Sequence, residues 1–457
     1  MHRRQFLKTG AAVGTFALIG TTGAQARDYR PGGPWAPNER AVNYSGYLDN
    51  EQLGERLQQI DKRSDRVELQ QVGTSAGRED PIWEVTIGDG NESVHIINQI
   101  HGDEPTGPEA MVRILQRLAR GNSPQVEEIL DNLTITMMPR VNPDGSNFVG
   151  EDGLGDEGEF RQRRINTNEW EEGDTRYKNA NSYYYWADHP GYDLNRGFNL
   201  LGHDPFDEQE AWWNVVDEEE ELAYLDIPIE EVPLDLKDPS VDENPYDVLW
   251  SMGTNVNPEN QAVTESYMEA DPDWAITHHH QTPALHPETP EKGGGPQWQS
   301  VMSVMAPFGP HYIREDEYDY AGYVGDGNPY MSEDAQTRSL QLNQLVNERM
   351  QDFGYGLFNT LTRFGYGPLW GSYLDGLAPR TDAAGMLYEV SHQSDDRGQK
   401  ALGTMVKVSV EGFMTTFESI ADGSIGDVDP LDYFDMPLAE YFSGPFSRQR
   451  GLRESRE

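Results

Sequence analysis

The first residues suited to chemistry are a histidine and a glutamate three positions apart, His101 and Glu104. They lie in a short polar run directly after an apolar stretch, residues 94–100, that is typical of a buried strand. A tight turn after such a strand can aim both side chains at one point. An imidazole and a carboxylate are two of the three protein ligands of a catalytic zinc site, with the third expected far downstream. The pair therefore raises the hypothesis of a metal site.

Four further segments carry polar groups at or beside predicted strands. They are Asn142-Pro143-Asp144-Gly145, Asp193-Leu194-Asn195-Arg196, His278-His279-His280, and Glu389 inside an apolar run. Open α/β sheets bind ligands at the carboxyl ends of their strands, so these groups could converge. Each segment alone has an ordinary explanation, such as a turn, a helix cap or an edge-facing charge. Their joint occurrence in this order indicates a functional site.

The elements that would position these residues alternate between helices and strands. Hydrophobic periodicity predicts helices over residues 47–62, 108–119, 257–270, 333–364 and 406–420. It predicts strands over residues 66–72 and 82–87, which read as a hairpin, and over residues 94–100, 133–138, 273–277 and 386–390. The strand 273–277 is expected to end at the histidine run. We expect an α/β fold with a mixed, mostly parallel central sheet, helices on both faces and a single catalytic domain.

The N-terminus has the layout of an export signal. Residues 1–26 contain Arg3-Arg4, an apolar run, and Ala24-Gln25-Ala26 as a small-residue cleavage site. The apolar run is too short for an ordinary membrane span, although an uncleaved anchor helix is an alternative. We therefore expect a twin-arginine signal peptide, a secreted protein, and no membrane contact after cleavage.

The rest of the chain divides into three predicted parts. We expect a leading arm at residues 27–45, the catalytic domain at residues 46–425, and a C-terminal tail at residues 426–457. Residues 205–247 are dense in Asp and Glu and are predicted to be a solvated acidic insertion in the domain.

The amino-acid composition indicates which classes of partner and which salt conditions suit the protein. The 457 residues include 79 acidic and 35 basic side chains, for a net charge of -44. Such a surface repels nucleic acid and anionic lipid, so neither is expected as a partner. The spread of acids indicates a halophile, because salt screens their repulsion, and we expect loss of structure or activity in dilute buffer. The chain has no cysteine, so zinc would need His and carboxylate ligands.

Taken together, these motifs resemble the zinc carboxypeptidase family of the carboxypeptidase A type, over roughly residues 45–425. The family pattern is His-x-x-Glu, an Asn-Pro-Asp-Gly turn, an arginine, an Asn-Arg pair, a histidine after a strand and a late glutamate. In this chain the pattern falls on His101 and Glu104, Asn142 to Gly145, Arg164, Asn195 and Arg196, the histidine run, and Glu389. The resemblance implies a monomeric metallocarboxypeptidase that holds one Zn²⁺ ion and removes residues from peptide or protein C-termini.

The same resemblance implies the metal ligands. His101, Glu104 and one downstream histidine would bind zinc, and Asp193 would support His101 by the hydrogen bond that a metal-bound imidazole usually needs. Alignment of the glutamine after the histidine run places the third ligand at His279, with His278 and His280 as alternatives. Two imidazoles and one carboxylate leave zinc an open position for water and a carbonyl oxygen.

The resemblance also assigns the groups around the substrate. Asn195 and Arg196 would hold the terminal carboxylate, since a guanidinium can bind a carboxylate through two hydrogen bonds. Arg164 would face the scissile carbonyl and stabilise the oxyanion, with Arg163 as the alternative. Glu389 would be the general base that takes the proton of the water and passes it to the leaving nitrogen.

Specificity is the least determined property. Leu374 falls where relatives that read basic C-terminal residues carry Asp, so we expect neutral or apolar terminal side chains. The neighbouring Asp375 could still favour Lys or Arg. The phenolic hydroxyl that usually closes over the substrate would come from Tyr366 or Tyr373, and simple packing explains either residue equally well.

Three other functions remain open. A zinc deacylase acting on N-acyl amino acids shares the His-Gly-x-Glu start, so that motif alone does not discriminate. A non-catalytic binding domain on the same fold would usually lack Glu389 or a zinc ligand, and this chain keeps them. A peptidoglycan-cleaving enzyme is a fourth reading, weakened if the organism lacks such a wall. The full motif set favours the peptidase.

Overall fold

The computed structural model of the protein describes most of the central part of the chain. The described residues are 29–30, 33–34, 46–147, 162–167, 191–198, 257–281, 284–287, 299–307, 309–312, 328, 330–353, 358–365, 371–391 and 402–441. The predicted signal peptide, the acidic insertion and Tyr366 lie outside them. Within the described ranges, no helix has the length and apolar character needed to cross a membrane.

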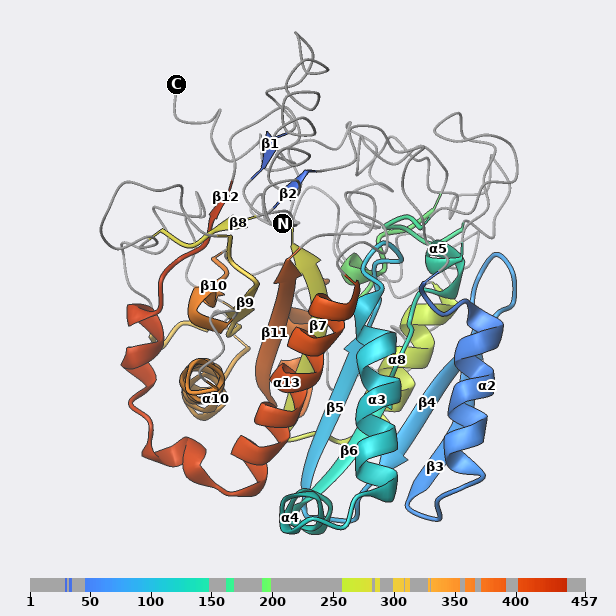
Figure 1. Ribbon diagram of the computed structural model, residues 1–457, viewed down its shortest axis with the longest axis horizontal. Helices are drawn as coiled ribbons and strands as arrows, with labels where there is room; N and C mark the ends of the chain where they lie inside the picture. The colour runs from blue at the N-terminus through green and yellow to red at the C-terminus, as the bar shows by residue number, and fades with distance from the viewer. Residues whose placement is uncertain are drawn as a thin grey trace, which may run out of the picture.

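An eight-stranded mixed sheet forms the centre of the fold (Figure 1). In spatial order its strands are β10 (Thr362–Arg363), β9 (Met302–Met305), β11 (Ala384–Ser391), β7 (Trp274–Gln281), β5 (Glu92–Asn98), β6 (Leu133–Met138), β4 (Pro81–Ile87) and β3 (Val67–Thr74). Strands β11, β7, β5 and β6 run parallel, whereas β3 and β4 form an antiparallel hairpin and β9 runs antiparallel to β11. This confirms the predicted α/β fold with a mixed, mostly parallel sheet.

Helices cover both faces of this sheet, as predicted (Figure 1). One face carries α2 (Asn50–Asp61), α3 (Thr106–Arg120), α4 (Pro124–Asn132), α10 (Glu333–Gln351) and α13 (Leu402–Ala421). The other face carries α8 (Pro258–Ala270) and the short α11 (Tyr373–Leu377). Each face therefore has its own apolar core, and the polar groups of the candidate site lie on the α8 side.

Local sequence explains where several helices begin. Asp49 accepts a hydrogen bond from the backbone N–H of Gln52 at the start of α2, and the Gln52 side chain accepts one in return, which forms a capping box. Ser123 and Ser332 cap α4 and α10 in the simpler way, through one side-chain oxygen. These caps satisfy N–H groups that would otherwise lack partners in the first turn.

Three predicted boundaries are wrong by four residues or more, and in one of them the last helix begins at Leu402 rather than at residue 406. The long helix ends at Gln351 rather than at Phe364, and the chain after residues 358–360 joins the edge of the sheet as β10. There the backbone N–H of Phe364 donates to the carbonyl of Val304, which a helix would not allow. The strand predicted over residues 273–277 continues through all three histidines to Gln281, because β11 and β5 pair with it on both sides.

Smaller elements complete the described structure. They are β1 (Tyr29–Arg30) paired with β2 (Gly33–Pro34), β8 (Ala284–Leu285) paired with β12 (Glu440–Tyr441), α5 (Pro143–Ser146), and 3-10 turns at Leu194–Arg196, Phe358–Thr360, Ala378–Arg380, Ser424–Asp427 and Pro430–Asp435. Tyr433 in the last of these turns is buried in the core beside α10, so this part of the predicted tail packs against the domain.

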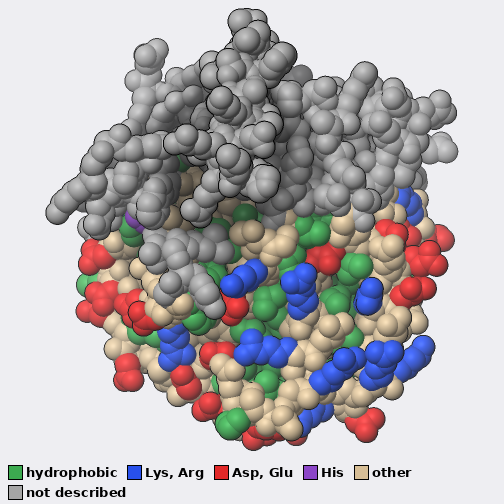
Figure 2. Space-filling view, viewed as in Figure 1, with side chains coloured by type: hydrophobic (Ala, Val, Ile, Leu, Met, Phe, Trp, Pro, Cys, Tyr) green, Lys and Arg blue, Asp and Glu red, His purple; other side chains and the backbone are tan. Residues whose placement is uncertain are grey.

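Surface charge is unevenly distributed on the described residues. In α3 the exposed side chains are Arg113, Arg117 and Arg120. Figure 2 shows Lys and Arg side chains gathered on this face of the molecule, with acidic side chains mostly toward its rim. The strongly negative net charge therefore does not produce a uniformly acidic surface.

Candidate active site

The turn that carries His101 and Glu104 is held by polar contacts on both sides. Gln99, at the end of β5, has φ 49°, in the left-handed region that a non-glycine residue seldom adopts. Its side chain donates to the carbonyl of Gly102 (2.8 Å) and accepts from Nε of buried Arg140 (2.7 Å). These contacts fix the turn before any ligand is present.

The Asn142-Pro143-Asp144-Gly145 segment forms the start of α5 and packs directly against the same turn. A Cβ on Gly102 would lie 2.1 Å from the carbonyl carbon of Gly145, so only glycine allows this approach. The Asn142 side chain donates to the carbonyls of Ile100 (3.2 Å) and Arg164 (3.1 Å). The predicted turn therefore connects the metal-site loop to the segment that carries Arg164.

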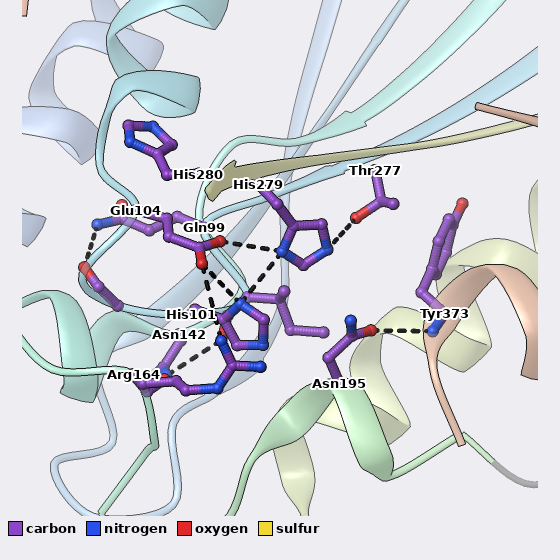
Figure 3. Close-up of polar contacts among 12 residues, drawn as sticks. Gln99, His101, Glu104, Asn142, Arg164, Asn195, Thr277, His279, His280 and Tyr373 are labelled. Carbon is purple, nitrogen blue, oxygen red and sulfur yellow. Dashed lines mark hydrogen bonds and ion pairs between the residues drawn. The ribbon is translucent and has the colours of Figure 1, made fainter. Parts of the chain in front are cut away.

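Three hydrogen-bond acceptors converge on one point in Figure 3. Nδ1 of His101 lies 3.0 Å from Oε1 of Glu104, Nδ1 of His279 lies 2.9 Å from Oε2, and the two Nδ1 atoms are 3.1 Å apart. Nε2 of His101 contacts Asp193 Oδ1 (3.2 Å), and Nε2 of His279 contacts the Thr277 hydroxyl (3.0 Å). If each Nε2 carries the proton for these contacts, both Nδ1 lone pairs face the carboxylate.

This donor set fits a zinc ion. The three side chains are buried and their ligand atoms lie within 4.8 Å of one another. Ligand atoms around tetrahedral zinc, with bonds of about 2.0 Å, are about 3.3 Å apart, close to the distances observed. With both Nε2 atoms protonated, the two imidazole lone pairs would face the carboxylate, and a bound cation would offset their repulsion.

The ionisation states of His279 and Glu104 suit a metal, whereas protonation of His101 would compete with metal binding. Burial lowers the pKa of His279 to about 4, so its imidazole is neutral at pH 7. Burial opposes ionisation of Glu104, but His101 and His279 hold its pKa well below its usual value. Burial and Arg164 oppose protonation of His101, whereas Glu104 and Asp193 raise its pKa overall. A neutral imidazole and a carboxylate are the ligand forms that a metal requires.

The three consecutive histidines lie on one β-strand, so their side chains alternate between the two faces of the sheet. His279 faces His101, while its two neighbours face the opposite side of the sheet. There Nε2 of His278 contacts the hydroxyl of Ser409 in α13 (2.9 Å), and Nε2 of His280 contacts Thr106 at the start of α3. Among the three candidates, the structure therefore brings His279 to the other two predicted ligands.

Glu389 lies beside these ligands. It pairs in parallel register with His279 and in antiparallel register with Ser303, so its side chain is on the same face of the sheet. Among the described residues, its Oε2 has no hydrogen-bond partner. Burial and then the charge of Glu104 raise the pKa of Glu389 well above its usual value, although Arg164 acts in the opposite direction.

Asp193 connects His101 to Arg164. Its Oδ1 contacts the imidazole, and its Oδ2 accepts from Nε of Arg164 at 2.7 Å. Burial opposes ionisation of Asp193, but Arg164 and His101 hold its pKa well below its usual value. The guanidinium of Arg164 also lies 3.9 Å from Glu104, whereas Arg163 donates to the carbonyl of Asn166. Arg164 is therefore the arginine of this pair that reaches the ligand cluster.

Asn195 and Arg196 lie in the 3-10 turn directly after Asp193. The Asn195 backbone N–H donates to Asp193 Oδ1 (2.9 Å), and Nη1 of Arg196 donates to the Asn195 carbonyl (2.7 Å). The Asn195 side-chain oxygen accepts from the backbone N–H of Tyr373 (3.0 Å). This contact fixes the amide orientation and directs its NH₂ group away from α11.

The residues predicted to set specificity lie nearby in α11. The hydroxyl of Tyr373 is buried and contacts Nδ1 of His95 (2.7 Å), so it packs in the core and is not at the surface of the site. Leu374 is buried in the same apolar core, and the Asp375 carboxylate accepts from the Ser372 hydroxyl (3.0 Å). Tyr366 is outside the described residues.

Sequence comparisons bear on this geometry. Residues 54–270 match the family model described as zinc carboxypeptidase. A curated relative, carboxypeptidase SOL1 of Arabidopsis thaliana, is 28% identical over 109 residues. That alignment spans only 22% of this chain and 22% of the relative. The family match includes His101, Glu104 and Arg164 but ends before His279 and Glu389, which only the fold brings to the same place.

Two solved structures share this fold. A structure of thrombin-activatable fibrinolysis inhibitor aligns with a TM-score of 0.53 and 14% identity, covering 86% of this chain and 78% of that one. The bovine form, in complex with tick carboxypeptidase inhibitor, aligns with a TM-score of 0.51 and 14% identity, covering 84% of this chain and 98% of that one. At this identity, the likeness concerns the fold alone.

Proposed function

We propose that the protein is a member of the zinc carboxypeptidase family and a zinc-dependent metallocarboxypeptidase that removes residues from peptide C-termini. The observation that carries this proposal is the convergence of His101, Glu104 and His279, with Glu389 in register beside them. The family match over residues 54–270 supports it independently.

The metal would be held by these three side chains, one Zn²⁺ ion in all. When bound, zinc lowers the pKa of a coordinated water and polarises the substrate carbonyl. Asp193 holds His101 in the tautomer whose Nδ1 is free to bind, and Thr277 does the same for His279. Both imidazoles are thus oriented before metal binding, which reduces the entropic cost of forming the site.

Proton transfer would be the task of Glu389. Its Oε2, which has no partner among the described residues, would accept the proton of the attacking water, and the carboxyl could then donate that proton to the leaving nitrogen. Burial raises the pKa of Glu389, but a nearby cation lowers it, so the carboxylate form is favoured in the loaded enzyme. The base would therefore be most effective when the metal is present.

Substrate recognition would depend on groups that bind carboxylate and carbonyl oxygens. The NH₂ group of Asn195, oriented by its contact with Tyr373, and the guanidinium of Arg196 would bind the terminal carboxylate. Arg164, held by Asp193, would stabilise the negative charge that develops on the scissile carbonyl oxygen. Such a site makes an exopeptidase, because an internal peptide bond offers no carboxylate.

The proposed preference is for neutral or apolar terminal side chains. Leu374 contributes an apolar group near Gly385, where a Cβ would lie 3.3 Å from it. The Asp375 carboxylate is tied to Ser372, which makes it a weaker partner for a substrate cation. Tyr366 stays the proposed phenolic residue over the substrate. Comparing release of Leu, Phe, Lys and Arg termini tests this preference, and faster release of Lys or Arg would contradict it.

Export is proposed from sequence alone. The twin-arginine motif and the cleavage site in residues 1–26 support secretion of the mature chain by that route. The net charge of -44 supports function at high salt. Replacing Arg3 and Arg4 with Lys should retain the protein inside the cell, and unchanged secretion of this variant would exclude the route.

The test of the function is release of C-terminal residues from a peptide set in high salt, with and without a chelator. We expect release that the chelator abolishes and added zinc restores. N-acyl amino acids are assayed in parallel, because a deacylase would share the metal cluster. Hydrolysis of these compounds without any release from peptides would overturn the proposal.

A further inference from the structure

A second buried carboxyl group lies outside the metal cluster, in the first turn of α8. Glu259 has no exposed surface. Its Oε1 accepts from the backbone N–H of Ala76 (2.9 Å), and the Asn166 amide group lies 3.3 Å from both of its oxygens. A carboxyl group in such a place is costly to bury, so its contacts need an explanation.

Asn166 links this carboxyl group to the candidate site through hydrogen bonds to Tyr192. Its side-chain oxygen accepts from the backbone N–H of Tyr192 (2.7 Å), and its own backbone N–H donates to the Tyr192 carbonyl (3.0 Å). Tyr192 directly precedes Asp193, the residue that contacts both His101 and Arg164. Glu259 is thus connected to Asp193 through one amide side chain and one peptide.

The next residue along the helix holds the other side of the same segment. The Asn260 side chain donates to the carbonyl of Leu194 (2.7 Å) and accepts from Asn257 (3.2 Å). A Cβ on Gly197 would lie 2.4 Å from Asn260, so the chain passes directly over this amide. The first turn of α8 therefore contacts residues 192–197 at both ends.

We propose that Glu259 is a positioning residue for the substrate-binding segment Asp193–Arg196, acting through Asn166. The assignment rests on the proposed function of that segment. Removal of the carboxyl group would free the Asn166 amide, loosen Tyr192, and let Asp193 move away from His101 and Arg164. Substrate binding and metal affinity would both fall, while the fold would be retained.

The protonation state of Glu259 gives the proposal a distinctive signature. Burial and the charge of Asp144 raise its pKa to about 8, against the hydrogen bonds that it accepts. Asp144 itself accepts from Ser75 Oγ (2.8 Å) and from the Gly77 N–H (2.7 Å), and Arg163 donates to the carbonyl of Asn166. With this pKa, Glu259 is mostly protonated at pH 7. Ionisation above about pH 8 would strengthen the hydrogen bonds that Glu259 accepts from Asn166 and Ala76, because the carboxylate is the better acceptor.

The experiment compares Glu259→Ala, Glu259→Gln and a control, Glu265→Gln, which changes an exposed residue of the same helix. KM and kcat are measured between pH 6 and 9, and zinc affinity is measured by competition with a chelator. We expect Glu259→Ala to raise KM and to weaken zinc binding by about 10-fold, the loss typical when the partner of a metal-bound imidazole is disturbed. The wild-type KM should fall as Glu259 ionises above pH 8, and Glu259→Gln, which cannot ionise, should lack this fall.

Either of two results would overturn the proposal. The first is wild-type KM and zinc affinity in Glu259→Ala. The second is a fall of KM above pH 8 in Glu259→Gln equal to that of the wild type, which also decides the matter if the alanine variant does not fold. Zinc affinity separates this inference from the proposed function. If the wild type binds zinc but releases no C-terminal residue, the proposed carboxypeptidase function is wrong. The proposed role of Glu259 is then tested by the zinc affinity of the alanine and glutamine variants alone.

Discussion

Glu389 of β11 lies directly opposite His279 of β7 in the parallel register of the central sheet. Residues paired in this way share one face, so the carboxylate and the imidazole lie side by side. His279 in turn contacts Glu104 at 2.9 Å, although 175 positions separate them in the chain. A single strand pairing thus places a proton acceptor beside the proposed metal ligands.

The first prediction concerns proton transfer. Glu389→Gln should reduce kcat by at least about 10²-fold, because it removes the group that accepts the proton of the water. Zinc content, measured by metal analysis, should stay near one ion per chain, since Glu389 is not a ligand. Normal turnover in this variant would refute the assigned base.

The second prediction distinguishes the three histidines. His279→Ala should lose zinc, because one of three protein ligands is removed. His278→Gln is the matched control: its side chain faces Ser409 on the other side of the sheet, so metal binding should persist even if thermal stability falls. Stoichiometric zinc in His279→Ala would show that the ligand lies elsewhere.

The third prediction concerns the terminal carboxylate. Arg196→Lys keeps the charge but loses the planar pair of donors. KM should rise by about 10-fold or more, the cost of a charge-assisted hydrogen bond of about 1.5–3 kcal/mol, with a smaller change in kcat. An unchanged KM for peptides with a free C-terminus would remove Arg196 from the binding site.

The fourth prediction concerns acid stability. Burial lowers the pKa of His95, which contacts Tyr373 and Ser266, to about 3. The unfolded chain therefore binds a proton that the folded chain does not, and the free energy of unfolding falls as pH decreases from about 6.5 toward 3. The contribution is on the order of 3 kcal/mol between pH 6.5 and pH 4.

Denaturant unfolding at several pH values measures this contribution. His95→Gln should show a shallower acid dependence than the wild type, whereas a control variant at the exposed His311 should match the wild type. Equal acid dependence in all three proteins would mean that His95 is not buried in its neutral form.

Sequence patterns predicted the parts of the fold with strong local periodicity. The strand at residues 133–138 was predicted with the bounds of β6, and the hairpin of β3 and β4 was predicted within two residues at either end. The four-residue strand β9 was missed, because its place between β10 and β11 depends on pairing with distant segments. Helix α4 was also missed, although Ser123 and Pro124 give a start signal.

In the site, too, features that depend on nearby residues were predictable, and features that depend on residues distant in the sequence were not. The types and order of the polar residues indicated a metal cluster, and alternation along a strand implies that only one side of the histidine run faces it. The role of Gln99 could not be predicted, because its φ depends on contacts with Gly102 and Arg140. Thr277, by contrast, lies two residues before His279 on the same face of one strand, so alternation alone places it beside that histidine.

The most direct measurement compares one peptide with a free C-terminal carboxylate and the same peptide as its amide, using the zinc-loaded protein at high salt. The proposed roles of Asn195 and Arg196 predict rapid release of the terminal residue from the free acid, at least about 10²-fold slower cleavage of the amide, and loss of both on chelation. Equal cleavage of the two peptides would contradict recognition of the terminal carboxylate, and undiminished release after complete removal of zinc would contradict the metal centre.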